Sequence, residues 1–341
     1  MKNSTPLIRP VTSYDVALHA GVSQSAVSRC FKLGASISKM TRAKVMKSAT
    51  ELGYQPNAIA QGLITRRSNL VAVIISSLTN LYYPEVLAEL TQRLAAHGVK
   101  VLLFSLSHES DVREVLQQVW SYRVDGAIVA ARLSPEQIRD FQKRGVPLVL
   151  YNRVEERAPC DSVCCDSAGG ERLLVSSLLE SGSQYFGIIA GPKDSYVGEE
   201  RVRSALECLA GAGIHDVPLV RGEFDYQTGR AGFKELVERT RGKLDAVICA
   251  NDLMGIGAVD AARHDFGRDV PGEVSVVGFD GVGPATWLSY KLTTIRQPVG
   301  RMTDAAVTML MARIADPSNP FERRLFSGHL LPGSSARLGS G

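Results

Sequence analysis

Short apolar runs alternate with amphipathic stretches over most of this chain, from Leu70 towards its C-terminus. Continuously apolar strands separated by helices are typical of parallel sheets that helices cover on both faces. About ten strands in roughly 270 residues fit two doubly wound α/β subdomains better than one sheet. The predicted strands include 71–75, 99–104, 127–130, 146–151, 186–190, 244–249 and 274–279, and the predicted helices 84–97, 134–144, 168–181 and 253–266.

The same pattern predicts where this part of the chain binds a ligand. Ligands of doubly wound folds bind beyond the carboxyl ends of the strands, and two facing subdomains enclose that edge in a cleft. We expect an N-terminal subdomain from about 70–164 and 295–322, and a C-terminal subdomain from about 165–294 and 323–341. Residues 70–341 are therefore predicted to form one ligand-binding domain.

Charge divides the chain into two parts with net charges of opposite sign. The whole chain carries 39 Lys+Arg and 35 Asp+Glu, a formal net charge of +4 that indicates little by itself. Residues 1–67 hold ten of these basic and two of these acidic residues, so this segment is +8 and the remainder is −4. A basic segment joined to a mildly acidic body is typical of a module that binds nucleic acid or a membrane surface.

The basic segment predicts three short helices. Thr12 and Asp15 have the spacing of a capping box at the start of the first helix, and Gly21 can adopt the left-handed conformation that ends it. A second helix is predicted at about 24–32 and a third at about 39–52. Two helices joined by a turn of about three residues that contains glycine form a helix-turn-helix.

Residues 56–69 form a separate piece between this helical segment and the alternating region. Asn57 can cap a short helix, but a helix that carries Gly62 and has only about two turns is marginal alone in water. Two interpretations stay open. The piece is either a flexible linker or a hinge that becomes helical only when a partner holds it.

The sequence argues against several other classes of protein. It contains no apolar run of about 18 residues, and none of the motifs GxxxxGK[ST], HExxH and GxSxG. Its first residues do not have the pattern of a secretory leader. The six cysteines and six histidines show no metal-ligand spacing, so we expect reduced thiols, no metal and no cofactor. No enzyme activity is expected.

The helical segment also carries a resemblance. Its motif VTSYDVALHAGVSQSAVSRCF is followed by ISKMTRAKVMKSATELGYQPN and AIAQGL. Further motifs follow in order: SLTNLYYPEVLAEL, VDGAIVAA, GVPLVLYNR, ANDLMGIGAV, VPGEVSVVGFD and KLTTIRQPVGRM. Together they resemble the LacI/GalR family of bacterial transcriptional regulators over nearly the whole chain.

The resemblance implies how the chain is divided and what each part does. Residues 1–55 would be a helix-turn-helix DNA-binding domain and residues 56–69 a hinge helix with its linker. Residues 70–341 would form an effector-binding and dimerisation domain that resembles periplasmic sugar-binding proteins. The family implies a homodimer with a small effector bound in the cleft.

The resemblance further implies which residues contact DNA. Gln24, Ser25 and Arg29 match family positions that read base edges, and Arg and Gln suit guanine and adenine in the major groove. The alternative is that these three side chains are simply solvated. Contacts to phosphates, which set register rather than sequence, are implied for Tyr14, Ser23, Ser28, Lys32, Ser38, Thr41 and Arg42.

In the hinge, the resemblance singles out Asn57, Ala60 and Leu63. Leu63 matches a leucine that the family wedges into the minor groove, where an apolar wedge unstacks a base step and kinks the duplex. The alternative is that Leu63 only packs between two hinge helices. If effector binding separates the paired hinges, their helices lose mutual support and DNA affinity falls.

For the effector cleft, the implied residues are amides, carboxylates, arginines and aromatics, which suit a polyol. The alternative is that Asn and Asp at strand ends cap turns. Asn152 stands where the family often has Asp, so a sugar, a sugar acid, a phosphorylated sugar and a nucleobase all stay open. The implied effector-binding residues are Asn80, Tyr82, Asn152, Arg153, Arg201, Phe224, Asn251, Asp280 and Gln297.

We therefore predict a cytoplasmic, sequence-specific DNA-binding transcriptional regulator, expected to be a repressor, that binds a pseudo-palindromic operator and a carbohydrate-like effector. No membrane partner is expected. Two alternatives belong to other classes. A periplasmic-type solute-binding protein would share the body but carry a leader and no basic head, and an α/β enzyme would need a phosphate loop or an acid–base pair.

Overall fold

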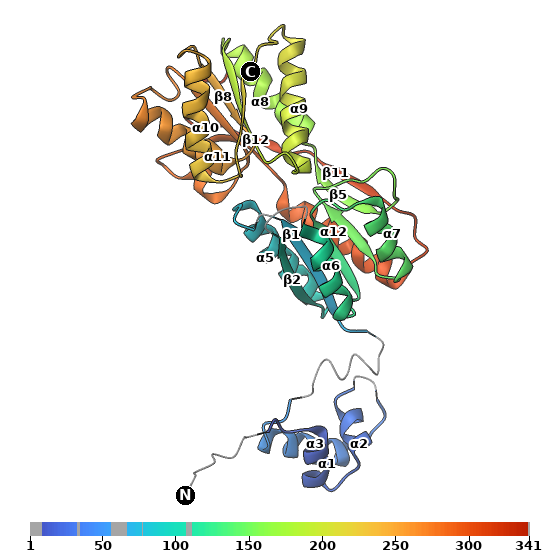
Figure 1. The fold of residues 1–341 in the computed structure, drawn as a ribbon. Helices are drawn as coiled ribbons and strands as arrows, with labels where there is room; N and C mark the ends of the chain where they lie inside the picture. Colours follow the sequence, from blue (N-terminus) through green and yellow to red (C-terminus); the bar gives the residue numbers. More distant parts are fainter. Residues whose placement is uncertain (1–8, 33–34, 56–66, 77, 107–110, 340–341) are drawn as a thin grey trace, which may run out of the picture. The chain divides into compact units, whose positions relative to one another are not determined.

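The computed structural model describes residues 9–32, 35–55, 67–76, 78–106 and 111–339 (Figure 1). The chain divides into two compact units, residues 1–68, here called the head, and residues 69–341, here called the body. The hinge positions Asn57, Ala60 and Leu63 lie outside the described residues. Among the helices that the structure describes, none is long and apolar enough to cross a membrane.

The head consists of α1 (Ser13–Ala20), α2 (Gln24–Cys30) and α3 (Lys39–Glu51), close to the predicted ranges. Each helix contributes an apolar side to one small core, as expected for short helices that are stable only when packed. The buried members of this core are Val16, Ala17, Val27, Cys30, Val45 and Ala49.

The ends of the head helices follow from their capping residues. The Asp15 carboxylate accepts hydrogen bonds from the backbone N–H and the hydroxyl of Thr12, at 2.9 and 2.7 Å, as the capping-box spacing predicted. Gly21 ends α1 with φ 65°. The Ser23 hydroxyl accepts the N–H of Ala26 at 3.2 Å and so caps α2. These contacts satisfy N–H groups that the first turn of a helix leaves without partners.

The body contains two sheets, each of which forms the centre of one lobe. The first lobe has the strand order β11-β5-β4-β3-β1-β2, and all its pairs are parallel. Side chains alternate along β1, so helices α5 and α12 pack on one face of the sheet and α6 and α7 on the other. The elements are β1 (Leu70–Ser76), α5 (Tyr82–Ala96), β2 (Lys100–Leu106), α6 (Val112–Ser121), β3 (Gly126–Ala130), α7 (Pro135–Lys143), β4 (Leu148–Tyr151), β5 (Asp161–Cys165), α12 (Val299–Ala315) and β11 (Arg323–Phe326).

The second lobe repeats this architecture with the strand order β12-β10-β9-β8-β6-β7, in which only the β10–β12 pair is antiparallel. Figure 1 shows α8 and α9 on one side of this sheet and α10 and α11 on the other. The elements are α8 (Ser167–Glu180), β6 (Phe186–Ala190), α9 (Tyr196–Gly211), β7 (Leu219–Arg221), α10 (Tyr226–Arg239), β8 (Ala246–Cys249), α11 (Asp252–Asp260) with a π-helical end (Ala261–Asp265), β9 (Ser275–Asp280), a 3-10 turn (Gly283–Thr286), β10 (Thr293–Arg296) and β12 (His329–Leu331).

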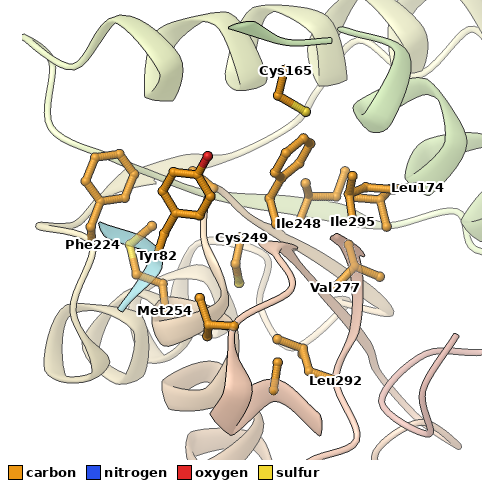
Figure 2. Packing of buried hydrophobic residues seen from close by; sticks show 14 of the residues in the cluster. Tyr82, Cys165, Leu174, Phe224, Ile248, Cys249, Met254, Val277, Leu292 and Ile295 are labelled. Atoms are coloured by element: carbon orange, nitrogen blue, oxygen red, sulfur yellow. The ribbon is translucent and has the colours of Figure 1, made fainter. Parts of the chain in front are cut away.

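Buried aliphatic side chains fill the second lobe. Figure 2 shows Ile248, Val277 and Ile295, contributed by the neighbouring strands β8, β9 and β10, in one cluster with Leu174 of α8. Tyr82 and Phe224, to the left in the same view, belong to the same cluster. This core therefore includes aromatic residues of the predicted effector set.

The chain passes between the lobes after β5, after β10 and after β11. Two expected boundaries differ from this arrangement. Ile295 and Arg296 stay in the second sheet as the end of β10. Residues 323–326, expected in the second subdomain, form β11 and pair with β5 in the first sheet, where they satisfy the open edge of that strand.

Candidate functional site

Helix α2 of the head presents polar side chains to solvent. Ser25 and Arg29 are exposed, and Gln24 is half-buried with its amide nitrogen donating to the Ser13 hydroxyl at 3.2 Å. The opposite side of α2 is buried through Ala26, Val27 and Cys30. The structure thus brings the three predicted base-reading residues to the solvent-facing part of one helix.

The residues predicted to contact phosphates also lie at the surface of the head. Tyr14 is 71% exposed, Thr41 is half-buried, and Ser23, Ser28, Lys32, Ser38 and Arg42 are exposed. Some of them already serve the fold, such as Ser23, which caps α2. The Ser38 hydroxyl accepts the Thr41 N–H at 3.1 Å, and the Arg42 guanidinium donates to the Cys30 carbonyl at 2.8 Å, which ties α3 to α2.

A cavity lies in the body at the carboxyl ends of the strands of both sheets. Ser76 ends β1 and Asp280 ends β9, while Asn152 and Gln297 directly follow β4 and β10. This is the edge at which parallel sheets bind ligands. Eight of the nine predicted effector residues line the cavity: Asn80, Tyr82, Asn152, Arg153, Arg201, Phe224, Asp280 and Gln297.

Asp280 is the centre of a buried polar network in this cavity. Its Oδ1 accepts hydrogen bonds from Arg201 Nη2 and from Gln297 Nε2, both at 2.8 Å. Burial raises the pKa of Asp280, and the neighbouring Arg201 guanidinium acts in the opposite direction. Arg201 also donates to the Ala250 carbonyl at 2.6 Å and stacks on the Phe279 ring, 3.8 Å from its centroid.

The network continues into the first lobe through Asn152. Its amide nitrogen donates to Gln297 Oε1 at 2.9 Å and to the Tyr82 hydroxyl at 3.2 Å. Its Oδ1 accepts the N–H of Cys165 at 2.8 Å. The Tyr82 and Tyr151 hydroxyls lie 3.2 Å apart, and burial raises the pKa of Tyr82. Hydrogen bonds among Asn152, Gln297 and Asp280 therefore join the two lobes across the cavity.

Arg153 occupies a second position in the first lobe. Its guanidinium donates to the Asn152 carbonyl at 2.9 Å and to the Ser76 hydroxyl at 3.3 Å, and its exposed fraction is 3%. A buried arginine of this kind presents a fixed array of donors to a ligand.

Three residues of the cavity have unusual backbone conformations. Asn152, Phe224 and Asp280 are non-glycine residues with φ 52°, 59° and 117°. Left-handed backbone costs an ordinary residue roughly 1–3 kcal/mol, and such strain concentrates at functional sites. The surrounding fold holds these side chains in place at the expense of local strain.

Asn251 is the predicted effector residue that does not line the cavity. Its Oδ1 accepts the N–H of Met254 at 3.0 Å, so it caps α11, and its amide donates to the Phe224 carbonyl at 2.9 Å. The contacts of Asn251 are thus those of the alternative interpretation, in which an Asn at a strand end caps a turn. Through the Phe224 carbonyl it still fixes a residue of the cavity wall.

Sequence reasoning missed part of the wall and two carboxyl groups behind it. Ser76, Tyr83, Pro192, Asp194, Ser195, Val197 and Glu223 also line the cavity. Asp252 and Glu171 are buried next to it in the second lobe, and burial raises the pKa of each to about 8. Their positions inside helices gave no sequence signal that would separate them from solvated acidic residues.

The chemistry of the cavity is that of binding. Its wall offers amide, hydroxyl, carboxylate and guanidinium groups together with the rings of Tyr82 and Phe224, which suits a small polar ligand with apolar faces. In the part of the chain that the structure describes, no group of three or more His, Cys, Asp or Glu residues could hold a metal ion.

Two family descriptions match this chain. Residues 12–57 match the bacterial regulatory proteins of the lacI family, and residues 175–336 match a periplasmic binding protein-like domain. The transcriptional regulator CelR of Thermobifida fusca is 31% identical over 328 residues, which cover 93% of this chain and 95% of CelR. Catabolite control protein A of Priestia megaterium is 28% identical over 305 residues, which cover 88% of this chain and 91% of that protein.

Solved structures give the same result. The lac repressor dimer bound to operator and the anti-inducer ONPF matches with a TM-score of 0.85 at 27% identity, over 96% of this chain and 99% of that chain. A complex of the regulator CelR with cellobiose matches with a TM-score of 0.71 at 29% identity, over 96% of this chain and 100% of that chain. Both matches extend over the head and the body.

Proposed function

Because this chain belongs to the lacI family of bacterial regulatory proteins, we propose that it is a transcriptional repressor whose operator affinity is set by a small molecule bound between the lobes of its body. One observation carries the proposal. A single chain combines a helix-turn-helix that exposes Ser25 and Arg29 with a polar cavity built from both lobes. Its relatives are regulators rather than enzymes.

In this proposal, Gln24, Ser25 and Arg29 read base edges in the major groove. Arg29 is suited to guanine because its two terminal nitrogens can bond N7 and O6 together. The surrounding set of Tyr14, Ser23, Ser28, Lys32, Ser38, Thr41 and Arg42 would fix the register on the phosphates, and Asn57, Ala60 and Leu63 would form the hinge at the minor groove.

The effector is proposed to be a small, donor-rich molecule of sugar-like chemistry. Asn152, Asp280 and Gln297 offer acceptors and donors for hydroxyl groups, while Tyr82 and Phe224 can pack against an apolar ring face. Because Asn152, Gln297 and Asp280 bond one another across the cavity, a ligand that replaces these bonds changes the contact between the lobes. This is how binding would reach the hinge and the DNA.

We further propose a homodimer that acts in the cytoplasm, where its operator lies. The outer side of α5 is apolar and open, with Pro84, Ala88 and Ala95 exposed beside the half-buried Leu78 and Leu87. In the second lobe, Trp287 and Leu288 are 60% and 85% exposed. Apolar side chains gathered in this way mark protein–protein contacts.

The DNA-binding half of the proposal is tested by selecting DNA from a random library with the full-length protein at low salt. We expect a pseudo-palindromic consensus. Arg29→Ala should relax the preference at one symmetric pair of positions and weaken specific binding by about 1–3 kcal/mol. Lys47→Ala, a change at an exposed position of α3, is the control and should leave the consensus unchanged. An unenriched library, or the same consensus with Arg29→Ala, contradicts the assignment.

A further inference from the structure

Glu171, on α8, is a carboxyl group enclosed in the second lobe with an exposed fraction of 0%. Neither of its oxygens has a hydrogen-bond partner among the described residues. Helix capping does not explain why a carboxyl is buried at this position, since the Asp166 carboxylate already accepts the Gly169 N–H at 2.8 Å and caps α8. A buried polar group left without partners is unfavourable, so a carboxyl in this state requires an explanation.

Arg201, on the adjacent helix α9, is also incompletely bonded. Its two terminal nitrogens donate to Ala250 and Asp280, but its Nε has no partner among the described residues. Glu171 and Arg201 interact electrostatically, which lowers the pKa of Glu171 against the larger effect of burial and raises the pKa of Arg201. The Arg201 guanidinium therefore interacts with two carboxyl groups. Asp280 is hydrogen-bonded to it at the cavity wall, whereas Glu171 is not hydrogen-bonded and does not line the cavity.

Among the described residues, the other surroundings of Glu171 do not supply a competing charge. The described titratable groups that interact with it besides Arg201 are the thiols of Cys208 on α9 and Cys249 on β8, and burial raises the pKa of both. They are neutral near pH 7. From β10, the apolar Ile295 packs next to the adjacent Gly170. The field at Glu171 is thus set by Arg201.

We propose that Glu171 is a positioning residue of the effector site. It is a second counter-ion, which holds Arg201 in place when hydroxyl groups of an effector replace Arg201 as the hydrogen-bond donors to Asp280. This rests on the proposed function of the cavity. Arg201 and Gln297 share one oxygen of Asp280, so a ligand that donates to this oxygen competes directly with Arg201. The positive charge is then balanced by Glu171 as it ionises.

The step has a defined proton balance. Burial keeps Glu171 protonated near neutral pH, because it raises the pKa of this group to about 8. When Asp280 turns to the ligand, the Glu171 carboxyl loses its proton to the buffer and becomes a carboxylate that attracts Arg201 electrostatically. Binding of a neutral, hydroxyl-rich effector should therefore release up to one proton. An anionic effector that binds Arg201 itself would leave Glu171 protonated.

The proposal can be tested on effector-free, full-length protein. Asp280→Asn imitates the loss of the first counter-ion, and infrared difference spectra against the same protein with Glu171→Gln isolate the Glu171 carboxyl. At pH 7 we expect a protonated carboxyl in the wild-type background and a carboxylate in the Asp280→Asn background. The change corresponds to a fall in the pKa of Glu171 by about 1–3, the size of the shift that a neighbouring cation causes in a carboxyl. Glu180→Gln, at an exposed position of the same helix, is the control, and its difference spectrum should be the same in both backgrounds.

A second variant keeps the proposal testable if Asp280→Asn does not fold. Arg201→Met removes the cation, so Glu171 should titrate at a higher pH than in the wild type. A Glu171 that titrates at the same pH in every background overturns the proposal. Because these readouts involve neither DNA nor effector, they can fail while regulation of an operator stands, and the reverse.

Discussion

Replacing Arg201 with methionine tests the polar network that joins the lobes of the body. The change removes a guanidinium whose side chain is 4% exposed and leaves the Asp280 side chain, 2% exposed, without its ion-pair partner at 2.8 Å. Methionine keeps apolar contact with the Phe279 ring, so the loss is mainly electrostatic. Removing one partner of a buried ion pair destabilises a protein by about 3–5 kcal/mol.

The stability of the Arg201→Met variant should depend on pH in a defined direction. Burial raises the pKa of Asp280, and Arg201 opposes this effect, so the variant should have a higher folded-state pKa for Asp280 than the wild type. A carboxyl with a raised folded-state pKa is ionised at any pH above that value, and there it destabilises the fold by the full amount. The destabilisation is relieved as the pH falls from there towards the ordinary value of 3.8. Arg201→Met should therefore recover part of its lost stability at mildly acidic pH.

Urea unfolding followed by tryptophan fluorescence measures this effect in the body. The two tryptophans of the chain, Trp120 and Trp287, both belong to the body, so the signal is independent of the head. Arg203→Met is the matched control on the same helix. Its side chain is 67% exposed and lies 3.9 Å from Glu207, and exposed pairs contribute at most about 1 kcal/mol. The reasoning is refuted if both substitutions destabilise equally, or if Arg201→Met is harmless at neutral pH.

Three further changes probe other parts of the molecule. Gly281 has φ 70°, and a Cβ there would lie 2.7 Å from the Cα of Arg296, so Gly281→Ala should destabilise the body by about 1–2 kcal/mol or more. Gly283, with nothing within 4 Å of its Cβ position, is the control, and Gly283→Ala should have an effect of about 0.5 kcal/mol or less in the same assay. Ser23→Ala removes the cap of α2 and should destabilise the head by about 0.5–2 kcal/mol, measured as faster amide exchange in α2; unchanged exchange would show that the cap is dispensable. Leu63→Ala, which removes the proposed minor-groove wedge, should weaken operator binding far more than nonspecific binding, and equal losses on both kinds of DNA would exclude the wedge.

The family resemblance named most of the cavity residues correctly. In the structure Asn152 follows β4, Asp280 ends β9 and Gln297 follows β10, and the carboxyl ends of parallel strands meet at one edge of a sheet. Asn251 follows β8 in the same way, but its side chain bonds the first turn of α11. From sequence alone the two outcomes look the same, because an amide suits both tasks.

Other features depended on contacts that the sequence pattern does not contain. Glu171 stands in a helix where an acidic residue ordinarily faces solvent, and the packing of α8 against α9 and the strands of the second lobe encloses it. The strand β11 alternates exposed and half-buried residues at the edge of the first sheet, so its pattern could not show which lobe it joins. Such assignments depend on tertiary pairing rather than on local periodicity.

The central claim is that a ligand in the cavity controls DNA binding, and operator affinity measured with and without ligand tests it directly. The full-length protein is titrated onto its selected operator in the presence of sugars, sugar acids, phosphorylated sugars and purines. We predict that at least one class changes the Kd about tenfold or more, corresponding to about 1.4 kcal/mol of coupling, and that Asn152→Leu abolishes the change while DNA binding persists. An operator affinity that no compound alters, or a response that survives in Asn152→Leu, would contradict the account.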